Sequence, residues 1–191
     1  MEKVTKQLLD WYHINKSDLP WRHTTNPYYI WISEIMLQQT RVEAVKEYYV
    51  RFIDRLPTLY DLATIEEDVL LKLWEGLGYY SRVRNMQKTA KILIEKGYKN
   101  LPNTRDELLS LPGIGEYTAG AILSISFDKP SVSIDGNVYR VLGRYYKIEE
   151  SISKRSTYSI YEKYILHILP SNNAGDFTQS FMDLGSLICT P

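Results

Sequence analysis

Two glycines that flank a single apolar residue, Gly113-Ile114-Gly115, separate two stretches of helical pattern and constrain the fold of this chain more than any other feature. Glycine tolerates positive φ and has no Cβ, so a hairpin built on these residues can bring bare backbone N–H groups against a bulky ligand. The second helix is expected to begin at about Glu116. Its first amides have no intrahelical partner and form an anion site, for which phosphate is the obvious ligand; an ordinary tight turn is the alternative.

Helical signals continue along nearly the whole chain. Asn26-Pro27 is an N-cap followed by proline at the first helical position, and it predicts a helix through Glu34. Thr64–Glu67 and Thr104–Glu107 both fit the capping-box pattern and predict two further helix starts. No segment shows strand alternation flanked by hairpin turns, so we predict an all-α chain of about ten helices.

The overall charge does not by itself predict a nucleic-acid partner. Lys and Arg number 23 and Asp and Glu also number 23, which suits an average near-neutral enzyme equally well. The charge is locally uneven, because residues 81–100 are basic and residues 61–75 are acidic. Solvated helix faces explain both runs, and so does a surface polarised for DNA. No apolar stretch has the pattern of a signal peptide or the length of a membrane span, so no membrane partner is expected.

Five motifs outside the hairpin extend the pattern over nearly all 191 residues. They are Leu19–Arg22, Ser33–Thr40, Gly76–Arg82, Asp135–Val138 and Met182–Gly185. Their order, with Leu-Pro-Gly-Ile-Gly followed about twenty residues later by an Asp, resembles the helix-hairpin-helix DNA glycosylases, the superfamily that includes endonuclease III. Together the motifs resemble its adenine-specific, MutY-type (A/G-specific) branch, whose members remove adenine mispaired with guanine or 8-oxoguanine.

The resemblance implies a two-lobed helix-hairpin-helix glycosylase fold with a DNA-binding cleft between the lobes. A six-helix lobe would span residues 22–130 and contain the helix-hairpin-helix at about residues 106–127. Residues 1–21 together with 131–191 would form the second helical lobe. That lobe would lack the iron–sulfur loop, and the chain would lack the C-terminal domain that reads 8-oxoguanine in the family. Glu34 and Asp135 would face each other across the cleft.

Two carboxyl groups, those of Glu34 and Asp135, suit the cleavage of a purine from deoxyribose. The base needs a proton to leave as a neutral species, and the sugar develops oxocarbenium-like charge at C1′. Glu34 lies among apolar residues such as Ile35, and burial with DNA bound would raise its pKa, as a general acid requires. Asp135 precedes a helix start at Gly136, where the ionised carboxylate is favoured. The plainer alternatives are a partly exposed helix residue for Glu34 and a simple N-cap for Asp135. We expect Asp135 to be an N-cap in either case.

The resemblance also implies which residues contact a flipped nucleotide. A base inside duplex DNA cannot reach such a pocket, so the enzyme must flip it. Gln38 and Tyr79 match the wedge positions of the family, and Arg22 and Asn137 match positions near the base and the sugar. The implied DNA-binding set is Arg22, Gln38, Gln39, Thr40, Tyr79, Tyr80, Arg82, Gly113, Gly115 and Thr118. The implied catalytic set is Glu34, Tyr117, Asp135 and Asn137.

Tyr117 indicates which branch of the superfamily the chain resembles. Members that also cut the DNA strand have a lysine there, which forms a Schiff base with C1′, and tyrosine cannot do this. The expected activity is therefore monofunctional hydrolysis that leaves an abasic site. A thymine or uracil mismatch glycosylase of the same superfamily is the first alternative. Glu34 favours adenine, because thymine leaves as an anion without ring protonation. A catalytically silent helix-hairpin-helix DNA-binding module is the second alternative.

The lone Cys189 excludes a disulfide framework within the chain. In the resembling family this cysteine opens a four-cysteine loop that holds a 4Fe–4S cluster, and a single cysteine cannot ligate one. We therefore expect a truncated or partial chain that does not bind the cluster, with a natural loss of the cluster as the alternative. The hydrolytic reaction itself is expected to need no cofactor. The expected partner is double-stranded DNA with an A:8-oxoguanine or A:G mismatch. The expected protein is a bacterial, nucleoid-associated cytoplasmic monomer.

Overall fold

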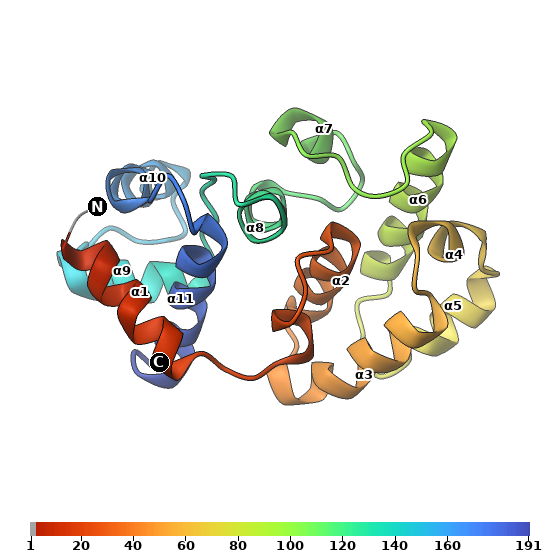
Figure 1. The fold of residues 1–191 in the computed structure, drawn as a ribbon, viewed down its shortest axis with the longest axis horizontal. Helices are drawn as coiled ribbons and strands as arrows, with labels where there is room; N and C mark the ends of the chain where they lie inside the picture. The colour runs from red at the N-terminus through yellow and green to blue at the C-terminus, as the bar shows by residue number, and fades with distance from the viewer. Residues whose placement is uncertain (1–2) are drawn as a thin grey trace. The chain divides into compact units, whose positions relative to one another are not determined.

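The computed structural model describes residues 3–191, apart from the side chain of Arg155, and over these residues it is all-α, as predicted. One 3-10 helix and eleven α-helices make up the described range, close to the expected number (Figure 1). Their bounds are α1 (Lys3–Asn15), η1 (Pro20–Arg22), α2 (Pro27–Leu37), α3 (Val42–Arg55), α4 (Leu59–Thr64), α5 (Glu67–Trp74), α6 (Ser81–Glu95), α7 (Arg105–Leu109), α8 (Glu116–Phe127), α9 (Gly136–Tyr146), α10 (Arg155–Ile168) and α11 (Ala174–Leu187).

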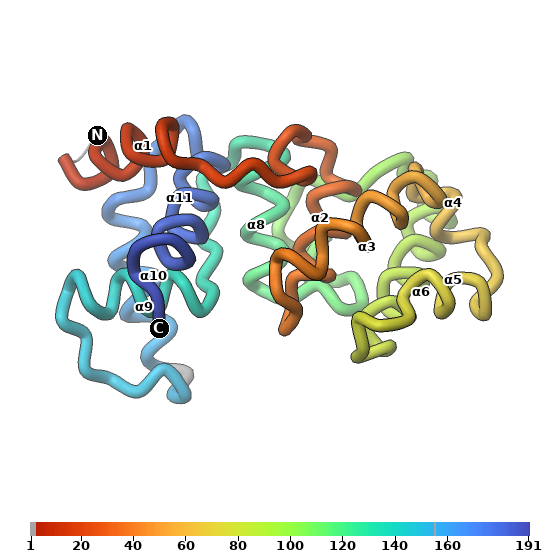
Figure 2. The backbone as a smooth tube through the Cα atoms, turned by 90° about the horizontal axis from the view of Figure 1, so that it is seen from below, coloured from red at the N-terminus to blue at the C-terminus, as the bar shows by residue number. Residues whose placement is uncertain are grey.

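The chain divides into two compact units. The central unit is Leu19–Ile122, and the terminal unit joins the residues up to Asp18 with Leu123–Pro191. The division falls inside α8, whereas the lobe boundary expected from the resemblance lies after that helix, between residues 130 and 131. In the terminal unit the first and last helices of the chain, α1 and α11, pack side by side (Figure 2).

Helix α2 is the buried centre of the central unit. Its residues Ile30, Trp31, Ile32, Ile35 and Met36 are all buried, so apolar side chains leave the helix in every direction. A helix that is hydrophobic all round has to be enclosed by other elements, and α3 and η1 pack on this one. A polar residue within α2 is consequently surrounded by protein.

The helix starts show where local sequence signals hold. Asn26 caps α2 as predicted, because its side-chain oxygen accepts a hydrogen bond from the backbone N–H of Tyr28 at 3.0 Å. The Thr64–Glu67 pattern does precede a helix, because α5 begins at Glu67, but Thr64 is not its N-cap: Thr64 ends α4, and its hydroxyl donates to the Tyr60 carbonyl one turn earlier. The reciprocal capping box lies instead at Thr58 and Asp61. The Thr64–Glu67 pattern runs from the last residue of α4 to the first residue of α5, whose N-cap residue, Glu66, forms no side-chain cap bond.

Thr104 stands at the N-cap of α7, as predicted, but it does not form the predicted box. Its hydroxyl donates to the Glu107 carboxylate and makes no bond to the helix backbone. The residue types of a capping box are therefore present without the reciprocal backbone bonds that define it.

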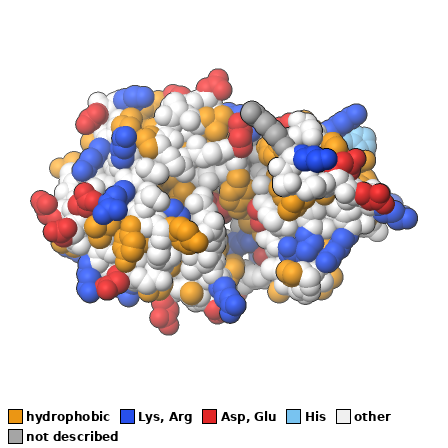
Figure 3. Space-filling view, turned by 180° about the vertical axis from the view of Figure 1, so that it is seen from behind, with side chains coloured by type: hydrophobic (Ala, Val, Ile, Leu, Met, Phe, Trp, Pro, Cys, Tyr) orange, Lys and Arg blue, Asp and Glu red, His pale blue; other side chains and the backbone are white. Residues whose placement is uncertain are grey.

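The core of the terminal unit joins segments from both ends of the chain. Leu8 and Leu9 of α1 belong to one apolar cluster with Val138 of α9 and with Phe177 and Phe181 of α11. None of the described helices is both long enough and apolar enough to cross a membrane. On the face drawn in Figure 3, Lys and Arg side chains are interspersed with Asp and Glu, in keeping with the equal totals of the two signs.

Asp128 fastens the start of α11 to the loop after α8. Its carboxylate accepts hydrogen bonds from the backbone N–H groups of Asn173 at 3.1 Å and of Ala174 at 2.6 Å. Asn173, the N-cap residue, gives no side-chain cap of its own. The free amides at the start of α11 are thus satisfied from a distant loop, which fixes the helix that carries Gly185.

Candidate active site and nucleic-acid interface

Glu34 is a carboxyl group enclosed in the apolar centre of the central unit. Only 4% of the residue is exposed, and Oε2 accepts a hydrogen bond of 2.6 Å from the Tyr117 hydroxyl. Tyr117 lies in the first turn of α8, immediately after the glycine hairpin, and is half-buried. A buried carboxyl group is costly without hydrogen-bonding partners, so its position indicates a role other than packing. The structure therefore brings together two residues of the predicted catalytic set, which are 83 positions apart.

Asp135 and Asn137 begin α9 in the terminal unit, and Asp135 is the N-cap as predicted. Asp135 Oδ1 accepts from the Val138 backbone N–H at 2.8 Å, and Oδ2 accepts from the Asn137 side-chain amide at 2.7 Å. Both carboxylate oxygens are therefore held by donors, which fixes the orientation of the group.

Arg140 extends this arrangement to the last residues of the chain. Its Nη2 donates to Asn137 Oδ1 at 2.7 Å and to the Gly185 carbonyl, and its Nε donates to the Cys189 carbonyl. Gly185 is needed here, since a Cβ at this position would lie 2.5 Å from Asn137 Cβ. The series Arg140, Asn137 and Asp135 thus links the segment around Cys189 to the candidate carboxylate.

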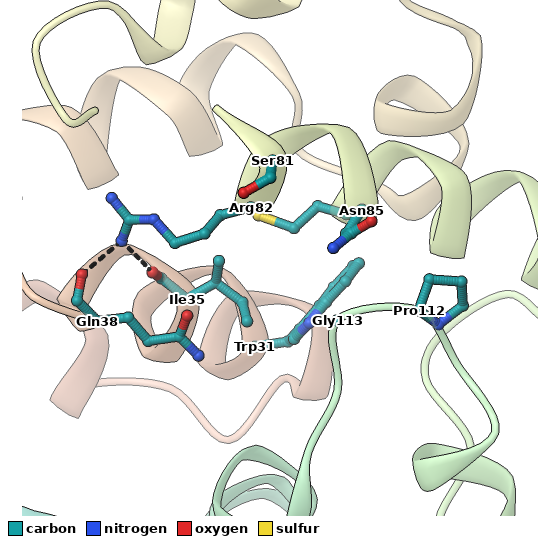
Figure 4. A pocket seen from close by; sticks show the side chains of 9 residues that line it. Trp31, Ile35, Gln38, Ser81, Arg82, Asn85, Pro112 and Gly113 are labelled. Carbon is teal, nitrogen blue, oxygen red and sulfur yellow. Dashed lines mark hydrogen bonds between the residues drawn. The ribbon is translucent and has the colours of Figure 1, made fainter. Parts of the chain in front are cut away.

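Arg82 ties the end of α2 to the loop before α6. One terminal nitrogen donates to the carbonyls of Ile35 at 2.8 Å and Gln38 at 2.6 Å, and the other donates to the Leu77 carbonyl at 2.9 Å (Figure 4). Burial lowers the pKa of the Arg82 guanidinium from its ordinary value, and the carbonyls compensate by accepting its protons in hydrogen bonds. The structure therefore gives Arg82, which the resemblance places among the DNA contacts, a role in shaping the two loops on either side of it.

Those two loops carry the residues that match the wedge positions. Tyr79 is 63% exposed and has a φ of +48°, Tyr80 is 37% exposed, and Gln39 is exposed with a φ of +59°. Positive φ is strained for residues other than glycine, so the fold holds the backbone of Tyr79 and Gln39 in conformations that a free loop would avoid. Gln38 and Thr40 are half-buried beside them. An exposed ring on a braced loop can enter a base stack, as the wedge hypothesis requires.

Two residues of α6 contact the glycine hairpin and hold it in place. Gly113 has a φ of +78° and is exposed, as is Gly115. The Thr89 hydroxyl donates to the Pro112 carbonyl at 2.8 Å, and a Cβ on Gly113 would lie 2.9 Å from Asn85 Cβ. Close approach and positive φ both require glycine at this position, which explains the Gly-x-Gly pattern physically.

Two other residues of the implied DNA-binding set are less accessible. Thr118 is buried, with 2% exposed, so its side chain faces the protein and not the surface. Arg22 is half-buried and ends the 3-10 helix η1, where its backbone N–H donates to the Leu19 carbonyl. Within the hairpin and the first turn of α8, the backbone N–H groups near Gly113 and Gly115 are therefore more accessible to a ligand than the side chain of Thr118.

The described residues do not by themselves fit an iron–sulfur cluster. Within residues 3–191, no three His, Cys, Asp or Glu side chains lie together as metal ligands would. Cys189 is a free thiol, and its sulfur accepts a hydrogen bond from Arg144 at 3.2 Å. A 4Fe–4S cluster takes four thiolates, so we derive no step through it.

A family model described as HhH-GPD superfamily base excision DNA repair protein matches residues 32–166. This chain belongs to that superfamily. The matched range covers part of each unit and contains Glu34, the hairpin and Asp135. The resemblance that the motifs indicated is thereby confirmed.

Known proteins of the HhH-GPD superfamily resemble the chain in sequence and in fold. The adenine DNA glycosylase of Buchnera aphidicola subsp. Baizongia pistaciae is 48% identical over 183 residues, which are 95% of this chain and 52% of that protein. The chain thus spans about half the length of this curated relative. A thermostable thymine-DNA glycosylase superposes with a TM-score of 0.85 at 27% identity, covering 98% of this chain and 87% of that one. A trapped endonuclease III–DNA covalent intermediate, at 24% identity, has the same fold (TM-score 0.80, covering 98% and 85%).

Sequence reasoning missed several residues of this HhH-GPD site. Thr89 and Asn85 support the hairpin from α6, and Arg140 and Gly185 hold Asn137. The spacing of Asn137 and Arg140 at i and i+3 on one helix was a usable signal. No sequence signal predicts the contacts of Thr89 and Asn85, because they join segments that are distant in the sequence.

Proposed function

We propose that this protein is a monofunctional DNA glycosylase of base excision repair. It hydrolyses the N-glycosidic bond of adenine mispaired with 8-oxoguanine or guanine after flipping the adenine out of the duplex. The observation that carries the proposal is Glu34, a carboxyl group buried among the apolar side chains of α2 and hydrogen-bonded to Tyr117. The adenine DNA glycosylases that this chain resembles support the choice of base.

The chemistry assigns different roles to the two carboxyl groups. Adenine is a poor leaving group until a ring nitrogen is protonated, and a carboxyl group in an apolar setting is suited to hold and deliver a proton. The hydroxyl of Tyr117 keeps that carboxyl group oriented. The carboxylate of Asp135, held by Asn137 and by the N-terminus of α9, stabilises the positive charge that develops at C1′.

The proposed partner is duplex DNA that contains an A:8-oxoguanine or A:G mismatch, bound by a monomer. Two solved structures that share the fold are complexes of endonuclease III with DNA. Exposed Tyr79 and the glycine hairpin provide a ring for the base stack and amides for backbone phosphate. Such a protein acts on chromosomal DNA, which in a bacterium is the nucleoid in the cytoplasm.

Replacing Glu34 with glutamine tests the proposal. Glu34→Gln keeps the shape and the bond to Tyr117 but removes the acid, so adenine release should fall by about 100-fold or more while mismatch binding stays nearly unchanged. Single-turnover excision and equilibrium binding measure the two quantities separately. Glu47→Gln, on the exposed surface of α3, is the matched control. Excision by Glu34→Gln within about tenfold of the parent would contradict the assignment.

A thymine mismatch glycosylase is the second candidate, favoured by the fold match to the thymine-DNA glycosylase. Thymine leaves as an anion and needs no ring protonation, so this activity should tolerate Glu34→Gln. Excision from A:8-oxoguanine, A:G and T:G duplexes in parallel separates the two candidates. Binding without release of any of these bases would indicate a silent helix-hairpin-helix module, an outcome that opposes both.

A further inference from the structure

A pocket of about 100 Å³ lies in the central unit between α2, the start of α6 and the glycine hairpin (Figure 4). In the same kind of volume, the space open to the centre of a water molecule, a single water needs roughly 10–15 Å³. The pocket is therefore large enough for a group bigger than one water molecule. It is lined by Trp31, Ile35, Gln38, Ser81, Arg82, Asn85, Met86, Pro112 and Gly113. Of these described residues, Arg82 carries the only charge, and no carboxylate lines the pocket.

Two buried donors that line this pocket have no partner. Trp31 is fully buried, and its indole Nε1 forms no hydrogen bond within the described part of the chain. The same holds for Nε of Arg82, although both terminal nitrogens of that side chain are hydrogen-bonded. Each group can donate and neither can accept. An unpaired buried donor is costly, so a hydrogen-bond acceptor that enters the pocket would be stabilised by either group once it comes within reach.

Three further polar side chains face the same space without a protein partner. The side-chain amides of Gln38 and Asn85 and the hydroxyl of Ser81 take part in no hydrogen bond among residues 3–191. Figure 4 shows Asn85 and Gln38 reaching toward the pocket from α6 and from the end of α2. All three groups can donate.

The start of α6 adds to the positive character of the pocket. This helix has 15 residues, and its N-cap residue, Tyr80, makes no side-chain cap bond. Ser81 is the first residue of α6 and lines the pocket. The N-terminus of a long uncapped helix carries partial positive charge and attracts anions.

We propose that this pocket binds an oxyanion, and that in the complex with DNA the oxyanion is one phosphate of the backbone. The proposal rests on the proposed DNA-binding function, and it places a second phosphate site on the α6 side of the hairpin, apart from the amides at the start of α8. The donor excess and the single positive charge select an acceptor-rich anion. The absence of a lining carboxylate disfavours a cation.

Inorganic phosphate is the first probe, because it tests the pocket without DNA. The chain has four tryptophans, and Trp31→Phe identifies the Trp31 indole N–H resonance in a ¹H–¹⁵N spectrum of the whole protein. Phosphate should shift that resonance saturably, whereas chloride at equal ionic strength should not. Asn85→Asp keeps the shape of the side chain and adds a negative charge, so it should abolish the shift. Asn172→Asp, on an exposed loop, is the matched control.

Duplex DNA with an A:G mismatch is the second probe. Neutral methylphosphonates replace the phosphates one at a time, and one position should lower affinity for the parent protein by about tenfold or more, as for lost hydrogen bonds to a charged group. The same replacement should have little effect on Asn85→Asp, whose contact is already lost. Circular dichroism checks that Asn85→Asp folds. Ser81→Ala removes one neutral donor, so in this variant the methylphosphonate effect on affinity should shrink, but by less than in Asn85→Asp.

Several results would overturn the proposal. A Trp31 resonance that responds to neither probe shows that the pocket takes no oxyanion. A methylphosphonate effect of equal size in the parent and in Asn85→Asp places that phosphate elsewhere. The Trp31 resonance could also respond to DNA whichever single phosphate is replaced, yet fail to respond to a duplex that lacks the base opposite adenine. That result would show that the pocket contacts the edge of a base and not a phosphate. Failure of adenine excision leaves these outcomes unaffected, because none of them measures catalysis.

Discussion

Glu34 and Arg82 are charged residues that the protein encloses for different purposes. The terminal N–H groups of the Arg82 guanidinium donate hydrogen bonds to backbone carbonyls and so hold two loops in place. Glu34 accepts a hydrogen bond from Tyr117 and lies among the apolar side chains of α2. At this position an apolar residue would stabilise the fold at least as well. A buried acid that is not required for packing is best explained by chemistry.

Tyr117 is expected to prevent strand cleavage, because a phenol cannot form a Schiff base with C1′. The product should be an intact abasic strand that breaks only after alkali or heat, and borohydride should trap little covalent enzyme–DNA adduct. Tyr117→Lys should raise borohydride trapping while lowering base release, since Glu34 loses its hydrogen bond. Strong trapping by the parent protein would mean that another lysine acts as the nucleophile.

Gly185 should matter for catalysis through Asn137. In Gly185→Ala the new Cβ would lie 2.7 Å from Asn137 Oδ1, so the side chain that donates to Asp135 must move. We expect base release to fall by about tenfold or more and the free energy of unfolding to fall by about 1–3 kcal/mol. Single-turnover excision and denaturant unfolding measure the two effects. Gly136→Ala adds a methyl group in open space beside Asp135 and is the control; equal losses in both variants would argue against the Asn137 contact.

At the scale of elements, α2 and α6 organise the central unit. Helix α2 is buried all round, and α6 packs on α4 and α5 with one face while its other residues reach the hairpin and the pocket. The short helix α4 depends on its cap, because a helix of 6 residues has few internal hydrogen bonds.

Thr58→Ala tests that dependence. The change removes the side-chain oxygen that accepts from the Asp61 backbone N–H, so the free energy of unfolding should fall by about 1 kcal/mol. Thr64→Ala is the matched control: its hydroxyl bonds within its own helix, and its loss should have little effect. Reversible denaturant unfolding compares the two. A larger loss for Thr64→Ala would mean that the sequence pattern, and not the observed box, marks the helix start.

At the scale of the whole molecule, the distribution of charge matters more than its sum. Equal numbers of cationic and anionic side chains cancel globally. Lys88 and Lys91 are exposed on α6 and make no ion pair within the described chain, whereas Lys46 and Lys72 are paired with Glu43 and Glu75. Exposed lysines without an ion-pair partner, such as these two on α6, are the side chains best suited to contact DNA phosphates.

Salt dependence of DNA binding checks this assignment. Each lost lysine–phosphate contact should lower the slope of log affinity against log salt concentration by about 0.9, so Lys88→Gln with Lys91→Gln should lower it by about 1.8. Lys46→Gln with Lys72→Gln removes the same charge from paired positions and should leave the slope nearly unchanged. Equal slopes for both double variants would show that α6 does not contact the DNA backbone.

Local pattern was sufficient for much of this protein. The all-α class, the cap at Asn26, the N-cap at Asp135 and the glycine hairpin all depend on residues within a few positions of one another. The ordered motifs were sufficient to indicate the superfamily, which the family comparison confirms. Short-range steric and hydrogen-bonding rules act in the same way in any fold, so they can be applied to a sequence alone.

Only the tertiary structure decided which partners the polar side chains have. Glu34 and Tyr117 are 83 positions apart, and Arg82 reaches carbonyls up to 47 positions away. Periodicity predicts which face of a helix is buried but not which helix covers it, so it could not distinguish the enclosed Thr118 from an exposed one or reveal the unpaired indole of Trp31. Those outcomes depend on the packing of distant segments, and burial and pairing are properties of that packing.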